Sequence, residues 1–366
     1  MSKISVDYLV VGSGVTGATI ARQLTDEGHE VMVLERRQHV AGNAHDTVHS
    51  SGIRYHTYGP HYFRTSSSRI WEFVNRFADF YKFEGVLQTD VNGQLERWPV
   101  HKDYIRKHVG ENWEPEFKGQ PGNFEEAALS IMPRLIYERF IEGYTRKQWG
   151  VLPTQLEPWL AKRFDVSTDD DLRLKKHRYQ GIPLGGYEAW AWRMLDGIDC
   201  QLGVDYLKER DRFHARKKVI FTGPVDEYFG YDLGPLAYRG QRRSLIFIPN
   251  VDYVYQVPQI NCPDIAAGPH VRILEWKHTL PEEERNVQGS LLTVETPFTP
   301  DDPGDYEYPF PSTENNELYK RYEARAKALD NVLICGRLGE YRYFDMDQAI
   351  ARAFVHVDRL LGRRQD

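Results

Sequence analysis

The segment that most constrains this chain is a glycine-rich turn between an apolar run and a helical pattern. Residues 6–11 form the apolar run, residues 12–17 read Gly-Ser-Gly-Val-Thr-Gly, and residues 15–24 have helical spacing. A second apolar run at 31–34 ends at Glu35. This order predicts a βαβ unit in which the glycines accept a dinucleotide pyrophosphate at the helix N-terminus. The predicted fold class is α/β, with a Rossmann-like dinucleotide-binding domain.

The residues around this turn favour FAD over a nicotinamide dinucleotide. Glu35 follows Gly12 at the distance where a carboxylate binds the hydroxyls of an adenosine ribose. A second glycine loop at 40–43 suits a long dinucleotide that passes close to the backbone. Arg36 alone would fit the 2′-phosphate of NADP, but Glu35 would then repel that phosphate. The cofactor-binding candidates are Gly12, Gly14, Val15, Thr16, Gly17, Glu35, Arg36, Gly42 and Asn43.

The bulk composition narrows the function classes. A chain of 366 residues is too long for one ordinary core and predicts two or three lobes. The net charge of −6 provides no overall positive field for nucleic acid or an anionic membrane, so a phosphate site must be local. Three widely spaced cysteines indicate neither a disulfide framework nor a zinc site, and we expect no metal. The absence of a leader and of a membrane-spanning segment predicts a cytoplasmic protein.

The domain organisation follows from where the patterns change. Short β-rich runs at 218–222 and 331–335 predict that the first domain takes strands from distant sequence. We therefore expect a discontinuous FAD-binding domain made of residues 1–67, 196–240 and 330–366. Helical spacing at 70–78, 123–132 and 135–150 predicts a helical substrate domain over residues 68–195, with a mobile loop at about 163–181. An antiparallel sheet domain is expected at 241–329, with strands at 244–248, 253–257, 271–276 and 290–294.

Several longer stretches resemble the UDP-galactopyranose mutase family over nearly the whole chain and in the family's order. They are residues 7–17, 35–43, 58–61, 143–150, 178–183, 185–187, 222–224, 271–275 and 336–347. The resemblance implies a flavin-dependent mutase that interconverts the pyranose and furanose forms of a nucleoside-diphosphate sugar. In that family reduced FAD attacks the anomeric carbon and expels the diphosphate, which returns after the sugar recloses through another hydroxyl. NADPH or NADH is the implied external reductant, and a homodimer is expected because family members are often dimers.

The resemblance also assigns roles to particular residues. Arg272 matches an arginine that grips the diphosphate, Arg163 one on the mobile loop that closes over it, and His61 a histidine against the flavin. Asp345 also suits the N-cap of the last helix. The implied catalytic residues are His61, Arg163, Arg272, Arg337, Tyr343 and Asp345, and Tyr58, Gly59 and Met346 join His61, Arg337 and Asp345 as flavin contacts. The implied substrate contacts are Phe140, Tyr144, Thr145, Trp149, Arg163, Leu174, Lys175, Arg239, Arg272, Tyr308 and Tyr343.

The chain departs from the family where the base of the nucleotide is expected. The mobile loop of the family usually carries a Tyr-Phe pair that sandwiches uracil, and this chain has Leu174 and Lys175 there. Arg64 stands where the family usually has a histidine, and Glu84-Gly85 stands near a usual asparagine. These departures leave the nucleotide open, so that UDP-, GDP- and TDP-linked sugars are all candidates.

Two other functions are compatible with a FAD-binding domain. An amine-oxidase-like oxidoreductase would pass hydride to an acceptor and would need no arginines around a diphosphate. A flavoprotein without turnover would need neither His61 nor Arg337.

Overall fold

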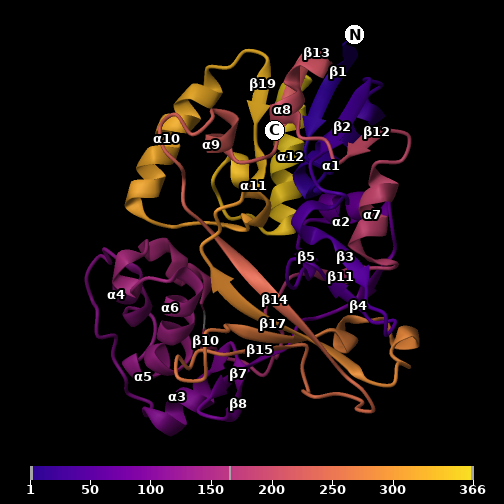
Figure 1. The fold of residues 1–366 in the computed structure, drawn as a ribbon. Coiled ribbons are helices and arrows are strands. Elements are labelled where there is room, and N and C mark those ends of the chain that lie inside the picture. The colour runs from indigo at the N-terminus through magenta and orange to yellow at the C-terminus, as the bar shows by residue number, and fades with distance from the viewer. Residues whose placement is uncertain (1–2, 165, 364–366) are drawn as a thin grey trace.

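A five-stranded parallel sheet lies at the centre of the computed structural model, which describes residues 3–164 and 166–363 (Figure 1). Its strands, in spatial order, are β12 (Asp199–Leu202), β2 (Val31–Glu35), β1 (Ile4–Val11), β13 (Phe213–Phe221) and β19 (Val332–Ile334). Val10 of β1 packs on one face of this sheet and Leu9 on the other, so both faces are covered. The βαβ opening and the strands predicted at 218–222 and 331–335 are confirmed.

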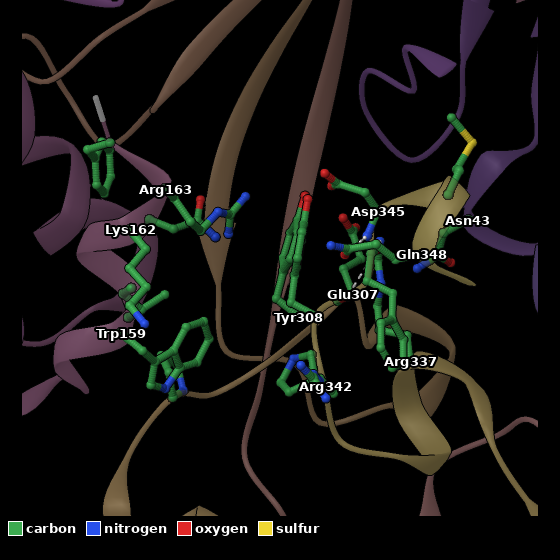
Figure 2. Close-up of a pocket in the computed structure, with 18 of the residues that line it drawn as sticks. Asn43, Trp159, Lys162, Arg163, Glu307, Tyr308, Arg337, Arg342, Asp345 and Gln348 are labelled. Atoms are coloured by element: carbon green, nitrogen blue, oxygen red, sulfur yellow. Dashed lines mark hydrogen bonds between the residues drawn. The ribbon is translucent and has the colours of Figure 1, made fainter. Parts of the chain in front are cut away.

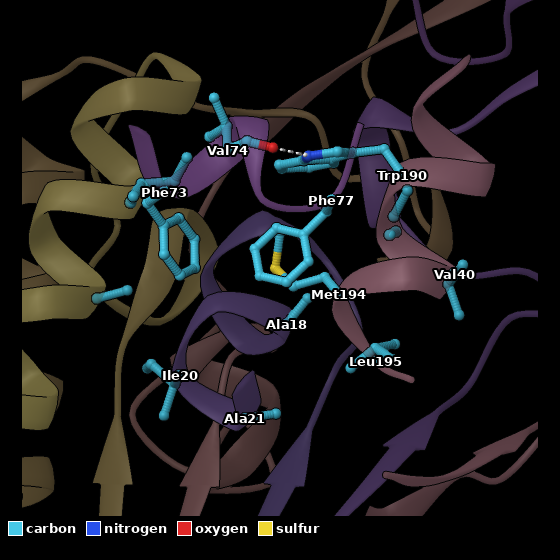
Figure 3. Packing of buried hydrophobic residues seen from close by; sticks show 14 of the residues in the cluster. Ala18, Ile20, Ala21, Val40, Phe73, Val74, Phe77, Trp190, Met194 and Leu195 are labelled. Carbon is cyan, nitrogen blue, oxygen red and sulfur yellow. Dashed lines mark hydrogen bonds between the residues drawn. The ribbon is translucent and has the colours of Figure 1, made fainter. Parts of the chain in front are cut away.

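Helices from three distant parts of the sequence share one face of the parallel sheet. They are α1 (Val15–Asp26), α2 (Ser68–Asn75), α7 (Gly186–Met194) and α12 (Met346–Leu360). Figure 3 shows their packing around Phe73, Phe77 and Met194. The Trp190 indole N–H donates to the Val74 carbonyl at 3.1 Å, which satisfies a polar group inside this core.

A seven-stranded, mostly antiparallel sheet crosses the molecule below the parallel sheet in Figure 1. In spatial order its strands are β18 (Tyr308–Pro309), β14 (Tyr238–Ile248), β17 (Ser290–Phe298), β16 (Arg272–Glu275), β15 (Gln259–Asn261), β7 (Leu87–Val91) and β8 (Gln94–Trp98). Only β15 and β7 pair in parallel among these strands of the described chain. The sheet thereby joins residues 87–98 to the segment 238–309.

A helical lobe packs beside this sheet and has an apolar core of its own. It comprises α3 (Lys102–His108), α4 (Phe124–Leu129), α5 (Arg134–Ile136), the π-helix η2 (Tyr137–Glu142), α6 (Gly143–Trp149), and the 3-10 helices η3 (Pro153–Gln155) and η4 (Pro158–Arg163). Asn123 caps α4, because its Oδ1 accepts from the Glu126 N–H at 3.0 Å.

Smaller elements complete the chain. The short strands are β3 (Asp46–Val48), β4 (Arg54–His56), β5 (Phe63–Thr65), β6 (Phe80–Lys82), β9 (Val100–His101), β10 (Val166–Ser167) and β11 (Tyr179–Pro183). The other helices are α8 (Tyr206–Glu209), α9 (Val225–Tyr228), α10 (Thr313–Lys327) and α11 (Gly336–Gly339), with 3-10 turns η1 (Gly42–Ala44), η5 (Arg210–Arg212), η6 (Trp276–Thr279), η7 (Glu282–Glu284) and η8 (Pro303–Asp305). Over residues 3–164 and 166–363, none of the helices combines the length and apolar character that crossing a bilayer requires.

Two expectations need correction. Residues 253–257 form no strand, because the N–H groups of Val254 and Tyr255 donate to the buried Glu275 carboxylate at 2.8 and 2.7 Å. The segment 68–195 is not purely helical, since it also contains β6 to β11. Its strands β7 and β8 are hydrogen-bonded into the seven-stranded sheet through distant partners, which local helical spacing does not reveal.

Candidate active site

Two glycine loops meet at the carboxyl ends of β1 and β2 and form a backbone cradle. Gly12 has a φ of +103°, and a Cβ there would lie 2.1 Å from Thr222 Oγ1. Gly42 has a φ of +55°, and its Cβ would lie 2.8 Å from the Gly14 Cα. Because side chains are excluded at both positions, the N–H groups at the start of α1 stay accessible to a phosphate.

Glu35 lies beside this cradle, and its carboxylate is fixed by three hydrogen bonds. Ser13 donates to Oε2 through its N–H and its hydroxyl, at 2.8 and 2.7 Å, and the Arg37 N–H donates to Oε1 at 2.9 Å. Glu35 and Arg36 line a cavity of about 220 Å³ together with the glycines of the cradle. The Arg36 guanidinium is held by Glu227 at 2.8 Å. The arrangement fits a ribose and a pyrophosphate side by side.

A larger cavity of about 1120 Å³ adjoins the small one. The two share the lining residues Asn43, His61, Arg337, Phe344 and Met346. Eight basic side chains line the larger cavity, namely Arg64, Lys162, Arg163, Lys175, Arg272, Arg337, Arg342 and Arg352, against the acidic Glu307, Glu340 and Asp345. In a chain with a net charge of −6, this local excess of positive charge favours an anionic ligand.

His61 lies where the two cavities meet, and a backbone carbonyl determines which of its ring nitrogens carries the hydrogen. Its Nδ1 lies 2.7 Å from the Gly59 carbonyl oxygen, so Nδ1 carries the hydrogen and Nε2 the lone pair of the neutral ring. The His61 N–H donates to His56 Nδ1 at 2.9 Å. Burial, aided by the charge of Arg337, lowers the pKa of His61 to about 4. The imidazole is therefore neutral at physiological pH.

Arg272 belongs to a buried network of alternating charge. Its Nε donates to Glu295, whose other oxygen accepts from Arg243 Nε at 2.8 Å. Arg243 also forms two 2.8 Å hydrogen bonds to Glu307. Burial alone would raise the pKa of Glu295, but Arg272 and Arg243 outweigh it and hold that pKa below its usual value. Glu295 thus fixes the Arg272 guanidinium, whose terminal nitrogens have no hydrogen bond among the described residues.

Gly59 supports this network without lining either cavity. It has a φ of +89°, and a Cβ there would lie 2.7 Å from Glu295 Oε1. The tight turn before His61 therefore packs directly against the carboxylate that holds Arg272.

Aromatic rings and guanidinium groups alternate along the middle of the larger cavity. Arg163 lies over the Tyr343 ring, with 4.1 Å from its central carbon to the ring centroid. Tyr343 stacks on Tyr308 at 6.1 Å between centroids, and Arg337 lies 5.0 Å from the Tyr343 centroid. Figure 2 shows Arg163 and Arg337 on opposite sides of Tyr308. Burial raises the pKa of Tyr308, so its hydroxyl stays neutral.

Asp345 occupies the start of α12 and faces two arginines. Arg64 donates to its carboxylate at 3.2 Å, and its own N–H donates to Gln348 Oε1 at 3.0 Å. Burial alone would raise the pKa of Asp345, but Arg64 and Arg163 outweigh it and lower that pKa. Arg64 is therefore bound within the site.

The structure brings most of the predicted site residues to one of the two cavities. The small cavity is lined by Gly12, Gly14, Val15, Thr16, Gly17, Glu35, Arg36 and Gly42. The larger one is lined by Tyr58, Phe140, Tyr144, Thr145, Trp149, Arg163, Leu174, Lys175, Arg272, Tyr308, Tyr343 and Asp345. Asn43, His61, Arg337 and Met346 line both.

Arg239 lies outside both linings, although we expected it to contact the diphosphate. Its guanidinium donates to the Gln148 and Lys147 carbonyls at 2.8 and 3.3 Å and to Thr299 Oγ1 at 2.6 Å. These carbonyls end α6, so in this structure Arg239 satisfies a helix C-terminus.

Sequence reasoning missed several lining residues, among them Trp159, Lys162, Gln259 and Asn261. Gln259 and Asn261 alternate along β15, and Asn261 pairs with Arg272 on β16. A strand predicted at 259–261 would have placed them on one face of the sheet. Trp159 and Lys162 lie in a short 3-10 helix, for which the sequence has no periodic signal.

Comparison with known proteins identifies the family. A family model described as UDP-galactopyranose mutase matches residues 139–343, and one described as an NAD(P)-binding Rossmann-like domain matches residues 10–77. A probable UDP-galactopyranose mutase of Klebsiella pneumoniae is 32% identical over 375 residues, which cover 97% of this chain and 95% of that protein. The chain belongs to the UDP-galactopyranose mutase family.

Members of the UDP-galactopyranose mutase family named for different substrates are about equally similar to this chain. A dTDP-fucopyranose mutase of Escherichia coli is also 32% identical, over 94% of this chain and 96% of that protein. A crystal structure of reduced UDP-galactopyranose mutase aligns with a TM-score of 0.77 over 98% of this chain and 94% of that chain, at 16% identity. The fold is that of the family.

Proposed function

We propose that this protein interconverts the pyranose and furanose forms of a nucleoside-diphosphate sugar, with FAD bound across the two adjoining cavities. The observation that carries the proposal is the junction of a dinucleotide cradle with a cavity lined by eight basic and three acidic side chains. A flavin enzyme that only passes hydride has no need for that charge. Membership of the mutase family supports the same reaction.

The residues of the small cavity fit FAD. The open backbone at Gly12, Gly14 and Gly42 would hold the pyrophosphate, and the Glu35 carboxylate the ribose hydroxyls. Asn43, His61 and Met346 would contact the flavin, because they line both cavities. When bound and reduced, FAD supplies a nucleophilic ring nitrogen for the anomeric carbon of the sugar.

The basic side chains would retain the diphosphate while it is detached from the sugar. Arg272 is fixed by Glu295, and Arg163 is aligned by the Tyr343 ring, so both can bind phosphate oxygens with little reorganisation. Guanidinium stays charged throughout, which suits a group that must bind the same anion before and after the ring change. The neutral hydroxyls of Tyr308 and Tyr144 would donate to the phosphate without adding negative charge, since burial raises both pKa values.

His61 and Asp345 would set the electrostatics beside the sugar. The neutral His61 ring presents the Nε2 lone pair, so it accepts a hydrogen bond and adds no positive charge. Asp345 stays ionised between Arg64 and Arg163 and keeps both guanidinium groups in place. The proposal leaves the nucleotide open among UDP, dTDP and GDP, because Leu174 and Lys175 line the cavity where the family usually has rings.

The test is turnover by the reduced protein. The purified protein is reduced with dithionite and incubated separately with UDP-galactose, dTDP-fucose and a GDP-hexose, and the pyranose and furanose forms are separated by chromatography. We expect a new ring isomer from at least one donor, and none from the oxidised protein. A protein that carries FAD yet produces no isomer from any donor would contradict the proposal.

A further inference from the structure

The larger cavity has two chemically different ends. Asn43 and Arg337 line the end shared with the dinucleotide cradle, and Trp159, Lys162 and Arg163 line the opposite end. Figure 2 shows the two groups on either side of Tyr308. On the proposed function, the sugar must contact the cofactor and the diphosphate must lie among the arginines. The nucleoside then extends to the end formed by η4.

Trp159 is the aromatic side chain available at that end. It exposes 43% of its surface, while the other described aromatic residues that line the cavity are buried or half-buried. It has no hydrogen bond or ring contact among the described residues. An indole exposed to this extent has a large apolar surface still to bury, so a flat ligand can stack on it.

The segment that carries Trp159 is anchored in the core of the helical lobe. Pro158 begins η4, and Leu160 and Ala161, the next residues after Trp159, are each 3% exposed in the core of the helical lobe. Arg163, at the end of the same turn, lies against Tyr343. The indole and a phosphate-binding guanidinium are therefore presented by one short, anchored element, four positions apart.

In the neighbouring segment, neither Leu174 nor Phe164 offers a free aromatic face for a base. Leu174 packs against the helical-lobe core, and its N–H donates to the Gly85 carbonyl at 2.8 Å. The ring of Phe164 is already packed edge-on against Trp98 and Phe124, at 6.0 and 5.7 Å between centroids. A planar base at this end would find a free aromatic face on Trp159.

We propose that the Trp159 indole is the platform on which the nucleobase of the substrate stacks. Stacking needs a flat ring and no particular hydrogen-bond pattern, so it accepts uracil, thymine or guanine. Trp159 thus supplies the aromatic contact that Leu174 and Lys175 do not. This inference rests on the proposed function, because it takes the ligand to be a nucleotide sugar.

The experiment measures binding of UDP, dTDP, GDP and inorganic pyrophosphate to the oxidised holoprotein by calorimetry. We expect Trp159→Ala to weaken binding of the preferred nucleoside diphosphate at least about fivefold, and Trp159→Phe to restore most of it. Pyrophosphate affinity should not change, because pyrophosphate carries no base. Trp192→Ala is the matched control, since Trp192 is 40% exposed on α7 and lies outside both linings.

The outcomes separate this inference from the proposed function. Nucleotide binding that survives Trp159→Ala unchanged, or pyrophosphate binding that weakens equally, would overturn the stacking role and leave the mutase proposal standing. A wild-type protein that binds the diphosphate and shows the Trp159 effect, but never isomerises a sugar, would overturn the mutase proposal alone. A wild-type protein that binds none of the four probes would overturn both.

Discussion

At the scale of single residues, burial determines which charges the site keeps. His61 is neutral because burial outweighs its tendency to bind a proton, whereas Glu295 is ionised because two guanidinium groups outweigh its burial. The distinction matters for the chemistry, because a site for a diphosphate needs fixed cations and no titrating group among them.

The neutrality of His61 predicts how stability depends on pH. Its pKa is about 4 in the folded protein and about 6.5 when unfolded, so the unfolded chain binds more protons between these values. The contribution of His61 to the free energy of unfolding is fully present above pH 6.5. It is lost as pH falls toward 4, and the loss is at most about 3 kcal/mol. In urea titrations at pH 7.5 and 5, His61→Gln should show a smaller pH-dependent loss than the wild type. The exposed His214→Gln should behave like the wild type, and an equal slope for His61→Gln would contradict this assignment.

The sequence predicted many site residues but not the surroundings that set their properties. His61, Arg163 and Arg272 follow from motifs and were found on the cavity wall. The partner of Arg272, Glu295, lies on another strand and is brought to it only by the sheet register. For the same reason the sequence could not show that the Arg239 side chain donates to the carbonyls at the C-terminus of α6.

At the scale of elements, the cradle depends on the contact between two loops. Gly42→Ala would place a Cβ 2.8 Å from the Gly14 backbone, whereas Gly28→Ala, also at positive φ, meets nothing within 4 Å. Both substitutions should cost about 1–2 kcal/mol of stability through the left-handed conformation. Only Gly42→Ala should purify with less FAD, measured as the ratio of flavin to protein absorbance. Equal flavin content in the two variants would argue against the cradle.

The loop around 167–176 is tied to its surroundings by a half-buried ion pair. Arg173 binds Glu84 at 3.2 Å, beside the hydrogen bond from the Leu174 N–H to the Gly85 carbonyl. The loop that we expected to be mobile is thus fastened at Glu84-Gly85 in this structure.

Loss of that ion pair should open the loop. A pair with about a third of each side chain exposed contributes about 0.2–1 kcal/mol, so Glu84→Gln should raise the rate of tryptic cleavage at 173–176 by up to about fivefold. The control is Glu114→Gln, which removes a surface ion pair with Lys118 outside the loop. Cleavage rates that match in the two variants would show that the pair does not hold the loop.

Over the whole molecule, the sequence predicted the parallel sheet better than the pairing between strands that lie far apart in the chain. Four strands of the discontinuous parallel sheet were predicted, because residues 6–11, 31–34, 218–222 and 331–335 are apolar or β-rich runs. The fifth, β12, was not predicted, because its sequence Asp-Cys-Gln-Leu has no such pattern. The sequence did not predict that β7 and β8 belong to the seven-stranded sheet. They join it through β15, which pairs with β7, lies far along the chain and has only 3 residues, Gln259–Asn261. The larger cavity lies between the lobes, so its volume and charge are properties of the assembled fold.

The proposed function requires that the diphosphate leaves the sugar and is held by the arginines until it returns. A donor that the protein turns over is prepared with ¹⁸O in the bond between the anomeric carbon and the diphosphate, and its label is followed by ³¹P NMR. With the reduced holoprotein we expect ¹⁸O to spread to the non-bridging oxygens of that phosphate, and with the oxidised protein we expect it to stay in place. Formation of the ring isomer with the label retained in the bridging position would contradict departure and return of the diphosphate.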